Sequence, residues 1–428
     1  MAGRRKNRTG HCKKAVVCIA MPVIPNGLMT VRQGMSDAQQ ADIVVIGGAV
    51  MGASVAFWLT RLQPGIAVLV VEQDPSFARA ATALSVASIR QQFTTAVNVN
   101  ISRFGIDFIR NIADHLGPQG GVSALGFKEN GYLFVTANEA AAATMRDVAA
   151  MQCSLGAATK IWTPDQIKAR FPWLAVTDLL AGSFGARDEG WFDNMGLLSG
   201  FRTAAKAQGA RFITDRVTGL RVSGGALVSV QLEKAGQIIC DAAVNAAGTG
   251  AANIMRMAGL NLPVEPRKRT VFVIDAPNAR HPDAPLLVDA GFYLRPEQNH
   301  WITATVPTDD GPCANDDFEP DLHLFEDVIW EQLYARAPGF DAVKVLRHWV
   351  GHYDFNTLDQ NAILGPHPAL PNLYLMNGFS GHGLQQSPAV GRGVAEHILT
   401  GGWQSIDLGD LSADRLISGH AFLETAVV

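Results

Sequence analysis

The 428-residue sequence predicts an α/β fold in which a doubly wound, Rossmann-like domain is interleaved with an α+β domain that has a mostly antiparallel sheet. Three observations predict this fold. Short apolar runs rich in β-branched residues lie far apart along the chain, as expected for strands of a buried parallel sheet. The first run leads through glycines into an apolar pattern at helical spacing. Other segments, such as GYLFVTAN from Gly131, have the pattern of antiparallel strands.

The first run is followed by a turn that is typical of dinucleotide-binding domains. Residues 43–46 are continuously apolar, and Gly47-Gly48-Ala49-Val50-Met51-Gly52 comes next. In such a turn the first glycine permits the bend, the second lets the backbone approach a pyrophosphate, and the last lets helix and strand pack closely. Gly47 and Gly52 keep the outer roles. Ala49 adds one methyl group near the phosphate, which we expect to tighten the fit rather than abolish it.

Two further segments support a dinucleotide. The second strand, AVLVVEQDP, ends in Glu72, whose carboxylate can accept hydrogen bonds from both ribose hydroxyls and would repel a 2′-phosphate, which argues against NADP. The small residues of AAVNAAG, up to Gly248, would let a third strand lie close to the ligand. An ordinary strand-to-helix turn and a plain core strand are the alternatives. The spacing alone leaves NAD and FAD both open.

Composition excludes several function classes. The formal net charge of -4 gives no bias toward nucleic acid, and five cysteines without C-x-x-C spacing argue against a disulfide framework or a zinc site. We therefore expect no metal and a reducing compartment, the cytoplasm. Residues 1–40 combine basic residues with a short apolar run; we expect a disordered leader or a start assigned too early, with Met35 as the natural beginning, in preference to an export signal. No later segment predicts a transmembrane span.

Five separated segments carry a family resemblance: the glycine turn, LSVASIRQQF from Leu84, VNAAGTGA from Val244, LPVEPRKRTVFV from Leu262 and NGFSGHGLQQSPAVGRGVAEHILTG from Asn377. Together they resemble the FAD-dependent D-amino-acid oxidase superfamily, in the branch of sarcosine oxidase, glycine oxidase and dimethylglycine dehydrogenase. The likeness is greatest to the FAD-dependent oxidoreductase domain-containing proteins. The resemblance implies that the cofactor is FAD.

The resemblance also implies which residues hold FAD. They are Gly47, Gly48, Ala49, Met51, Gly52, Glu72, Gln73, Ser85, Ser88, Val217, Gly248, Gly381, His382, Gly383, Leu384 and Gln385. Near the last of these, Ser387 and Pro388 have the pattern of an N-cap and a first helical residue, and Gly401 that of a helix stop. In the family this helix N-terminus faces the flavin ring, where its partial positive charge stabilises the reduced form.

The activity implied is oxidation of the C–N bond of a small amino acid, by hydride transfer to flavin N5 followed by imine hydrolysis. A secondary or N-substituted amine, such as sarcosine or iminodiacetate, is the expected substrate. The candidate catalytic residues are Arg90, His382, Gln385, His352, Tyr293 and Lys268. Arg90 matches a family arginine that grips the substrate carboxylate, for which a guanidinium is suited; a structural salt bridge is the alternative. His382 is expected to act as acid or base, or to hydrogen-bond the flavin, with a pKa near neutrality.

Two of these residues are informative by what they replace. His352 stands where sarcosine oxidase has the cysteine that is covalently bonded to FAD, so we expect FAD to be bound non-covalently. Gln385 stands where the monomeric oxidase has a lysine that promotes reaction with oxygen. The electron acceptor is therefore left open between oxygen and a quinone or electron-transfer protein. Lys268 matches the strand beneath the flavin, and Tyr293 the strand on the substrate side of the pocket.

The expected domains are discontinuous. Residues 41–118, 180–258 and 345–405 are assigned to the FAD domain, 119–179 and 259–344 to the substrate domain, and 406–428 to a C-terminal tail. We expect the active site where the two domains meet, a packing helix over 98–116 and a capped helix after Thr163. Two other functions remain open: a respiratory-complex assembly or partner-binding flavoprotein with structural FAD, as the resemblance allows, and an NAD-linked dehydrogenase. A homo-oligomer is also expected as a possible state.

Overall fold

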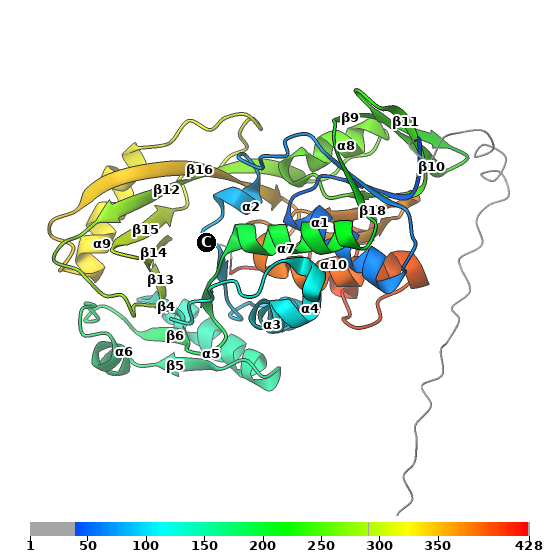
Figure 1. Ribbon diagram of the computed structural model, residues 1–428. Helices are drawn as coiled ribbons and strands as arrows, with labels where there is room; N and C mark the ends of the chain where they lie inside the picture. Colours follow the sequence, from blue (N-terminus) through cyan, green and yellow to red (C-terminus); the bar gives the residue numbers. More distant parts are fainter. Residues whose placement is uncertain (1–38, 290, 427–428) are drawn as a thin grey trace, which may run out of the picture.

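A computed structural model describes residues 39–289 and 291–426, in which two eight-stranded sheets lie side by side (Figure 1). The expected leader lies almost wholly outside the described residues. The first sheet is built from β1 (Gln40–Ile46), β2 (Val68–Glu72), β8 (Arg211–Thr214), β9 (Val217–Ser223), β10 (Ala226–Leu232), β11 (Gly236–Asn245), β17 (Ile363–His367) and β18 (Leu370–Asn377). The second is built from β4 (Tyr132–Thr136), β5 (Thr159–Trp162), β6 (Ala181–Gly185), β12 (Val264–Asp275), β13 (Leu286–Asp289), β14 (Phe292–Glu297), β15 (His300–Thr305) and β16 (Lys344–Asn356).

Helices connect and cover these strands. They are α1 (Val50–Leu62), α2 (Ala81–Leu84), α3 (Ala96–Arg110), α4 (Ile112–Leu116), α5 (Glu139–Ser154), α6 (Pro164–Arg170), α7 (Asn194–Ala207), α8 (Ala251–Met257), α9 (Trp330–Arg336), α10 (Gly383–Thr400) and α11 (Arg415–Ser418). The short strands β3 (Ser88–Ile89) and β7 (Gly190–Trp191) pair with each other beside the second sheet. The searched part of the chain contains no helix long and apolar enough to span a bilayer.

The first sheet is the predicted doubly wound core. Its strands run in the order β8-β2-β1-β11-β18-β17, parallel from β8 to β18, with the β9–β10 hairpin attached to β11. Because successive side chains of a strand point to opposite faces, Ile43 and Val45 pack with α1, α7 and α10, whereas Val44 and Ile46 pack with α8 and the hairpin. The predicted strand over 43–46 is confirmed as buried on both faces.

Helix α10 lies against α1, and this packing fixes where it begins. A Cβ on Gly391 would lie 2.1 Å from Ser54 Oγ, so only glycine allows this approach. Ser54 Oγ donates to the Ser387 carbonyl at 2.7 Å, and Trp58 Nε1 donates to the Pro388 carbonyl at 3.0 Å. These contacts bring the start of α10 next to the glycine turn at the carboxyl end of β1.

The predicted start of this helix is wrong. Helix α10 begins at Gly383, with His382 as its N-cap, and Pro388 lies inside it. Proline has no N–H for the carbonyl one turn back, here that of Leu384, but the Ser387 hydroxyl donates to that carbonyl at 2.9 Å. The helix therefore continues through the proline. Its predicted stop is confirmed, because Gly401 adopts the left-handed conformation at φ +81°.

The expected packing helix over 98–116 is divided into α3 and α4. Asn111 interrupts it with φ -112° and ψ 31°, and its side-chain amide donates to Asp107 Oδ1 at 3.0 Å. This local bond offers the backbone an alternative to the helix. The capped helix after Thr163 is confirmed as α6, with a reciprocal capping box between Thr163 and Gln166.

The second sheet is mostly antiparallel, as predicted, with the order β16-β12-β15-β14-β13-β4-β6-β5 and one parallel pair, β13–β4. One face is covered by α9 and the preceding π-helical turn, which pack on Phe272 and Ile274. The other face carries Val271, Val273 and Tyr293. The domain boundaries remain a prediction; strand pairing places β6 and β16, from the 180–258 and 345–405 segments, in the second sheet.

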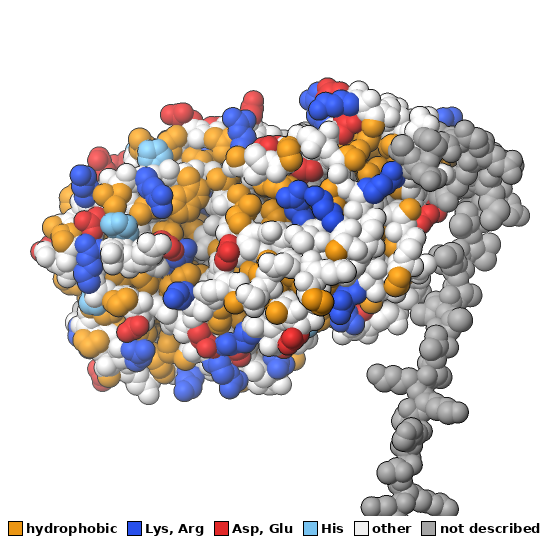
Figure 2. Space-filling view, in the orientation of Figure 1, with side chains coloured by type: hydrophobic (Ala, Val, Ile, Leu, Met, Phe, Trp, Pro, Cys, Tyr) orange, Lys and Arg blue, Asp and Glu red, His pale blue; other side chains and the backbone are white. Residues whose placement is uncertain are grey.

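Figure 2 shows acidic and basic side chains interspersed over one face of the molecule. Hydrophobic side chains gather on this face over β12 and β16. Figure 1 shows the last described residues entering the region between the second sheet and helices α7 and α10.

Candidate active site

The glycine turn has the geometry of a dinucleotide cradle. Gly47 directly follows β1 with φ +98°, and a Cβ on Gly52 would lie 1.9 Å from the Gly47 carbonyl oxygen. Ala49 is the N-cap of α1, and its side chain caps no N–H group. The first hydrogen bond of the helix runs from the Ala53 N–H to the Ala49 carbonyl, at 2.8 Å. The N–H groups of Met51 and Gly52 therefore point beyond the helix start, a position that suits a phosphate.

Glu72 lies beside this turn, at the end of β2. Its Oε2 accepts the Gly48 N–H at 2.7 Å and its Oε1 accepts the Asp74 N–H at 2.8 Å. Each oxygen keeps a lone pair for a ribose hydroxyl. The neighbouring Gln73 is exposed. The strand ends thus present a fixed carboxylate beside free helix N–H groups, which fits the ribose and pyrophosphate of FAD.

The other predicted FAD residues lie in three places. Gly248 follows β11 with φ +52°, and Val217 opens β9 with a buried side chain. Ser85 Oγ accepts the Ala87 N–H at 3.0 Å, and Ser88 Oγ accepts the Tyr132 hydroxyl at 3.1 Å. A direct role for these residues in holding FAD remains a prediction.

The loop before α10 is pressed closely onto its neighbours. Gly381 has φ +94°, and a Cβ there would lie 2.6 Å from the Tyr353 ring. A Cβ on Gly383 would lie 3.3 Å from the Met51 side chain, and Leu384 is buried. The loop therefore joins the glycine turn of the first sheet to β16 of the second.

Arg90 is buried near the start of α10. Its guanidinium donates through Nη1 to the Gln92 carbonyl at 2.5 Å and through Nη2 to His382 Nε2 at 2.9 Å. It also lies over the Phe93 ring, with Cζ 4.3 Å from the ring centre. Within the described residues no carboxylate forms an ion pair with Arg90. The structural salt bridge considered as the alternative is therefore not found among these residues.

His382 is neutral in this setting. Burial, together with the positive charge of Arg90, lowers its pKa to about 3. The expectation of a pKa near neutrality is wrong, because the ring is buried and its Nε2 accepts from a guanidinium. Its ring meets Phe93 edge-on, with ring centres 5.0 Å apart. His382 is thus placed to hold the Arg90 guanidinium in position.

Gln385 also contacts Arg90, through the backbone. Its Oε1 accepts the Arg90 N–H at 3.0 Å and lies 3.4 Å from the Ser102 hydroxyl, which in turn donates to the Arg90 carbonyl. The structure therefore brings Arg90, His382 and Gln385 together, as the sequence predicts for one site.

Tyr293 lies on the face of the second sheet that carries Tyr132. Burial raises the pKa of Tyr293 well above its ordinary value, and the neighbouring Tyr353 and Tyr132 add to this effect. The Arg90 guanidinium lies 6.0 Å from the centre of the Tyr132 ring. The buried tyrosine rings thus belong to the second sheet, and Tyr132 brings this sheet next to Arg90.

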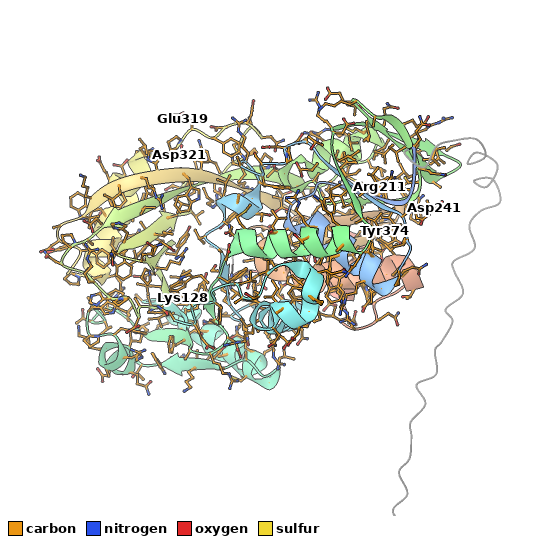
Figure 3. The ribbon with its side chains drawn as sticks, in the orientation of Figure 1. Lys128, Arg211, Asp241, Glu319, Asp321 and Tyr374 are labelled. Atoms are coloured by element: carbon orange, nitrogen blue, oxygen red, sulfur yellow. The ribbon has the colours of Figure 1, made fainter. Side chains whose placement is uncertain are left out.

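Lys268 and His352 pair with each other on neighbouring strands, in register. Lys268 forms ion pairs with Asp317 at 3.2 Å and with Asp321, labelled in Figure 3, at 3.1 Å. Burial opposes the charge of Lys268, but the hydrogen bonds to Asp321 and Asp317 outweigh it and raise its pKa. His352 stacks on Phe318, and its Nε2 donates to the Asp317 carbonyl at 2.6 Å.

By strand alternation, Lys268 and His352 share the strand face opposite to that of Arg269 and Tyr353. Burial lowers the pKa of His352. Direct contact of Lys268 or His352 with FAD or substrate remains a prediction.

One buried acid near Arg90 was missed by the sequence analysis. Glu189 accepts the Gln91 N–H at 2.9 Å and the Gln92 side-chain amide at 2.8 Å. Burial raises its pKa to about 7, although these hydrogen bonds and the charge of Arg90 act in the opposite direction. Its sequence context, ARDEGWF, has no motif that could have identified it.

Comparisons with known proteins agree with this geometry. Residues 42–397 match the family described as FAD dependent oxidoreductase, DAO. The chain is 38% identical over 426 residues to FAD-dependent oxidoreductase domain-containing protein 1 of Bos taurus, an alignment that covers 91% of this chain and 87% of that protein. It is 26% identical to mitochondrial sarcosine dehydrogenase of Mus musculus, over 88% of this chain and 42% of that protein. Among solved structures, L-proline dehydrogenase from P. horikoshii superposes with a TM-score of 0.79 and 26% identity, covering 90% of this chain and 99% of that one.

Proposed function

The chain belongs to the FAD-dependent oxidoreductase (DAO) family, and on that premise we propose that it oxidises the C–N bond of a small secondary or N-substituted amino acid, such as sarcosine or iminodiacetate. Its family and relatives support FAD-dependent oxidation of amino-acid or amine substrates. The choice of a secondary or N-substituted amino acid as the substrate is our proposal.

The buried guanidinium of Arg90 carries the proposal. A buried charge is costly unless a partner of opposite sign or sufficient hydrogen bonds compensate it. Arg90 has carbonyl, imidazole and aromatic neighbours, and no carboxylate pairs with it in the described chain. A substrate carboxylate would supply an opposite charge, and its two oxygens match the planar fork of a guanidinium.

The surrounding residues would hold and orient the substrate. His382 is neutral and accepts from Arg90 Nη2, which fixes the guanidinium without competing for its charge. Tyr132 lies beside Arg90, and Tyr293 is buried in the same cluster as Tyr132, so both would exclude water from the substrate side. When bound, FAD would supply the two-electron acceptor for the hydride that leaves the carbon next to the nitrogen. The glycine turn and Glu72 would hold its pyrophosphate and ribose.

Two relatives support a secondary amine. The mouse relative is a sarcosine dehydrogenase, and the structural neighbour from P. horikoshii is an L-proline dehydrogenase. Sarcosine and proline are both secondary amines with a carboxylate on the adjacent carbon. Because the chain spans 42% of the sarcosine dehydrogenase, its substrate is proposed here by similarity of site chemistry.

The electron acceptor is also a proposal. Gln385 supplies no cation, so we expect reaction with oxygen to be slow and a quinone or an electron-transfer protein to take the electrons. The cytoplasmic location, the homo-oligomer and the non-covalent attachment of FAD remain predictions of the sequence.

Anaerobic mixing tests the proposal. The holoenzyme is mixed with sarcosine, iminodiacetate, proline and glycine, and the flavin absorbance is followed. Dimethylamine is the matched control for sarcosine because it has the same secondary nitrogen without the carboxylate. We expect bleaching by a secondary amino acid and none by dimethylamine. Equal bleaching by dimethylamine would contradict the role of Arg90, and no bleaching by any amino acid would favour a partner-binding role with structural FAD.

A further inference from the structure

A segment far along the chain reaches the proposed substrate site. We call residues 422–426 the closing segment. Its Glu424 is fully buried and accepts the backbone N–H and the hydroxyl of Thr94, at 2.9 and 2.5 Å, the Thr95 hydroxyl at 2.9 Å and the Asn98 side-chain amide at 3.0 Å. One carboxylate thus anchors the segment to the start of α3.

The backbone of the closing segment is bonded as well. The Phe422 N–H donates to Asp359 Oδ2 at 2.9 Å, and the Glu424 N–H donates to the Asp359 carbonyl at 3.1 Å. The Thr425 N–H donates to Thr94 Oγ1 at 3.2 Å, and the Ala426 N–H donates to Glu424 Oε1 at 3.0 Å. Three of these bonds hold the segment to Asp359 and Thr94, and the fourth, within the segment, fixes its turn.

That position places a backbone oxygen on Arg90. The Ala426 carbonyl accepts from Arg90 Nη2 and lies 3.2 Å from His382 Nε2. Nη2 is the nitrogen that also donates to His382. A carbonyl oxygen is the neutral counterpart of a carboxylate oxygen, so the Ala426 carbonyl takes a donor that a substrate carboxylate would use.

We propose that the closing segment is a built-in competitor of the substrate: anchored by Glu424, it occupies the Arg90 guanidinium with the Ala426 carbonyl and leaves when a carboxylate binds. The inference rests on the proposed function, since it gives the regulation of that same site. A carbonyl brings no negative charge to the buried cation, whereas a carboxylate does, so the carboxylate is the stronger ligand for Arg90 once it gains access.

The mechanism has a measurable consequence. Only the fraction of molecules with the segment displaced can bind a carboxylate, so the apparent Kd exceeds the intrinsic Kd by the inverse of that fraction. Weakening the anchor raises this fraction. Loss of Glu424 therefore tightens carboxylate binding, while the chemistry at Arg90 is unchanged.

Acetate, a small monocarboxylate, is the probe: it is titrated into the holoenzyme at constant ionic strength while the flavin absorbance is followed. Glu424→Ala removes the anchor. Leu423→Ala is the matched control, since that side chain lies in the same segment and is 51% exposed. We expect the acetate Kd to fall about tenfold or more in Glu424→Ala and to stay within about twofold of the parent in Leu423→Ala. An unchanged Kd in Glu424→Ala overturns the proposal.

A second measurement uses the unmodified protein and so does not depend on how a variant folds. Amide hydrogen exchange of peptides that contain the closing segment is compared in saturating acetate and in chloride. We expect exchange at the amides of Phe422, Glu424, Thr425 and Ala426 to rise severalfold in acetate, because their hydrogen bonds break when the segment leaves. Unchanged or slower exchange in acetate overturns the proposal.

Variants of Arg90 distinguish a failure of the closing-segment proposal from a failure of the proposed function. Arg90→Ala in the Glu424→Ala background is expected to abolish acetate binding. If acetate binding depends on Arg90 but not on Glu424, the closing segment is not a competitor and the proposed function stands. If acetate binds equally well without Arg90, the carboxylate site of the proposed function is misplaced and the closing segment has nothing to compete for.

Discussion

Replacing Gly52 with alanine tests the cofactor cradle. The added Cβ would lie 1.9 Å from the Gly47 carbonyl oxygen and 3.0 Å from its carbonyl carbon. Real Cβ contacts do not fall below 3.0 Å, so α1 and the end of β1 must separate by about 1 Å. The obstructing atoms are backbone at the end of a buried strand, so no side-chain rotation relieves the overlap.

Two magnitudes follow from this displacement. Overpacking of a close-packed site costs about 1–3 kcal/mol of folding stability. A shift of this size also moves the Met51 and Gly52 N–H groups away from a bound phosphate, and a hydrogen bond to a charged group contributes about 1.5–3 kcal/mol. Loss of one such bond weakens FAD binding by about 10- to 150-fold.

The assay is the flavin-to-protein absorbance ratio after dialysis, together with the Kd for FAD from flavin fluorescence. Gly402→Ala is the control, because a Cβ there would have an ordinary contact of 3.8 Å with the Gln404 side chain. We expect Gly402→Ala to retain FAD and Gly52→Ala to lose it. Full retention of FAD with unchanged Kd in Gly52→Ala would refute the assignment of this turn to the pyrophosphate.

Three other changes have defined outcomes. Ala49→Gly removes one methyl group at the turn, and the Kd for FAD should stay unchanged or fall slightly; markedly weaker binding would show that the methyl group packs against the cofactor. Glu189→Gln should flatten the dependence of the unfolding free energy on pH. In the parent protein, burial raises the folded-state pKa of Glu189 from 4.5 to about 7. The stability that the neutral acid provides is therefore fully present below about pH 4.5 and is lost as the pH rises through about 7. Between pH 5 and pH 8 this loss corresponds to about 2–3 kcal/mol of unfolding free energy, measured by urea unfolding, and an unchanged slope against pH would contradict it. Gln385→Leu leaves the Arg90 N–H without its acceptor and should cost about 1–3 kcal/mol of stability and raise KM, with thermal unfolding and steady-state kinetics as the readouts.

The parts of the fold that the sequence predicts are those set by local pattern. The apolar run over 43–46, the glycine turn and the acid at Glu72 come from residues that lie close together in sequence, and each has one dominant structural reason. The turn at Gly401 is predictable for the same cause, since a glycine after a helical pattern permits the left-handed stop.

The errors arise where distant residues decide the local structure. Pro388 predicts a helix start on local rules, but the contacts of α10 with Ser54 and Trp58, together with the Ser387 hydroxyl, keep the helix intact through it. His382 has an ordinary pKa on its own, and only the fold buries it against Arg90.

The site was predicted in the same uneven way. Arg90, His382 and Gln385 were found through a family resemblance and prove to be in contact. Glu189 and Glu424 carry no motif, and their contacts with the region of Arg90 depend on chain crossings that no local pattern encodes. Residues of this kind become visible only from burial and hydrogen bonding in three dimensions.

The most direct test of the central claim is the anaerobic rate of flavin reduction by sarcosine, measured against its concentration in the parent protein and in Arg90→Ala. If Arg90 binds the substrate carboxylate, the parent should be reduced with saturation. In the variant the Kd for sarcosine should rise by about 30-fold or more, the equivalent of about 2 kcal/mol or more for a lost charged pair. The account would be contradicted if sarcosine, iminodiacetate and proline all failed to reduce the flavin of the parent protein. It would also be contradicted if sarcosine reduced the flavin of Arg90→Ala with an unchanged Kd.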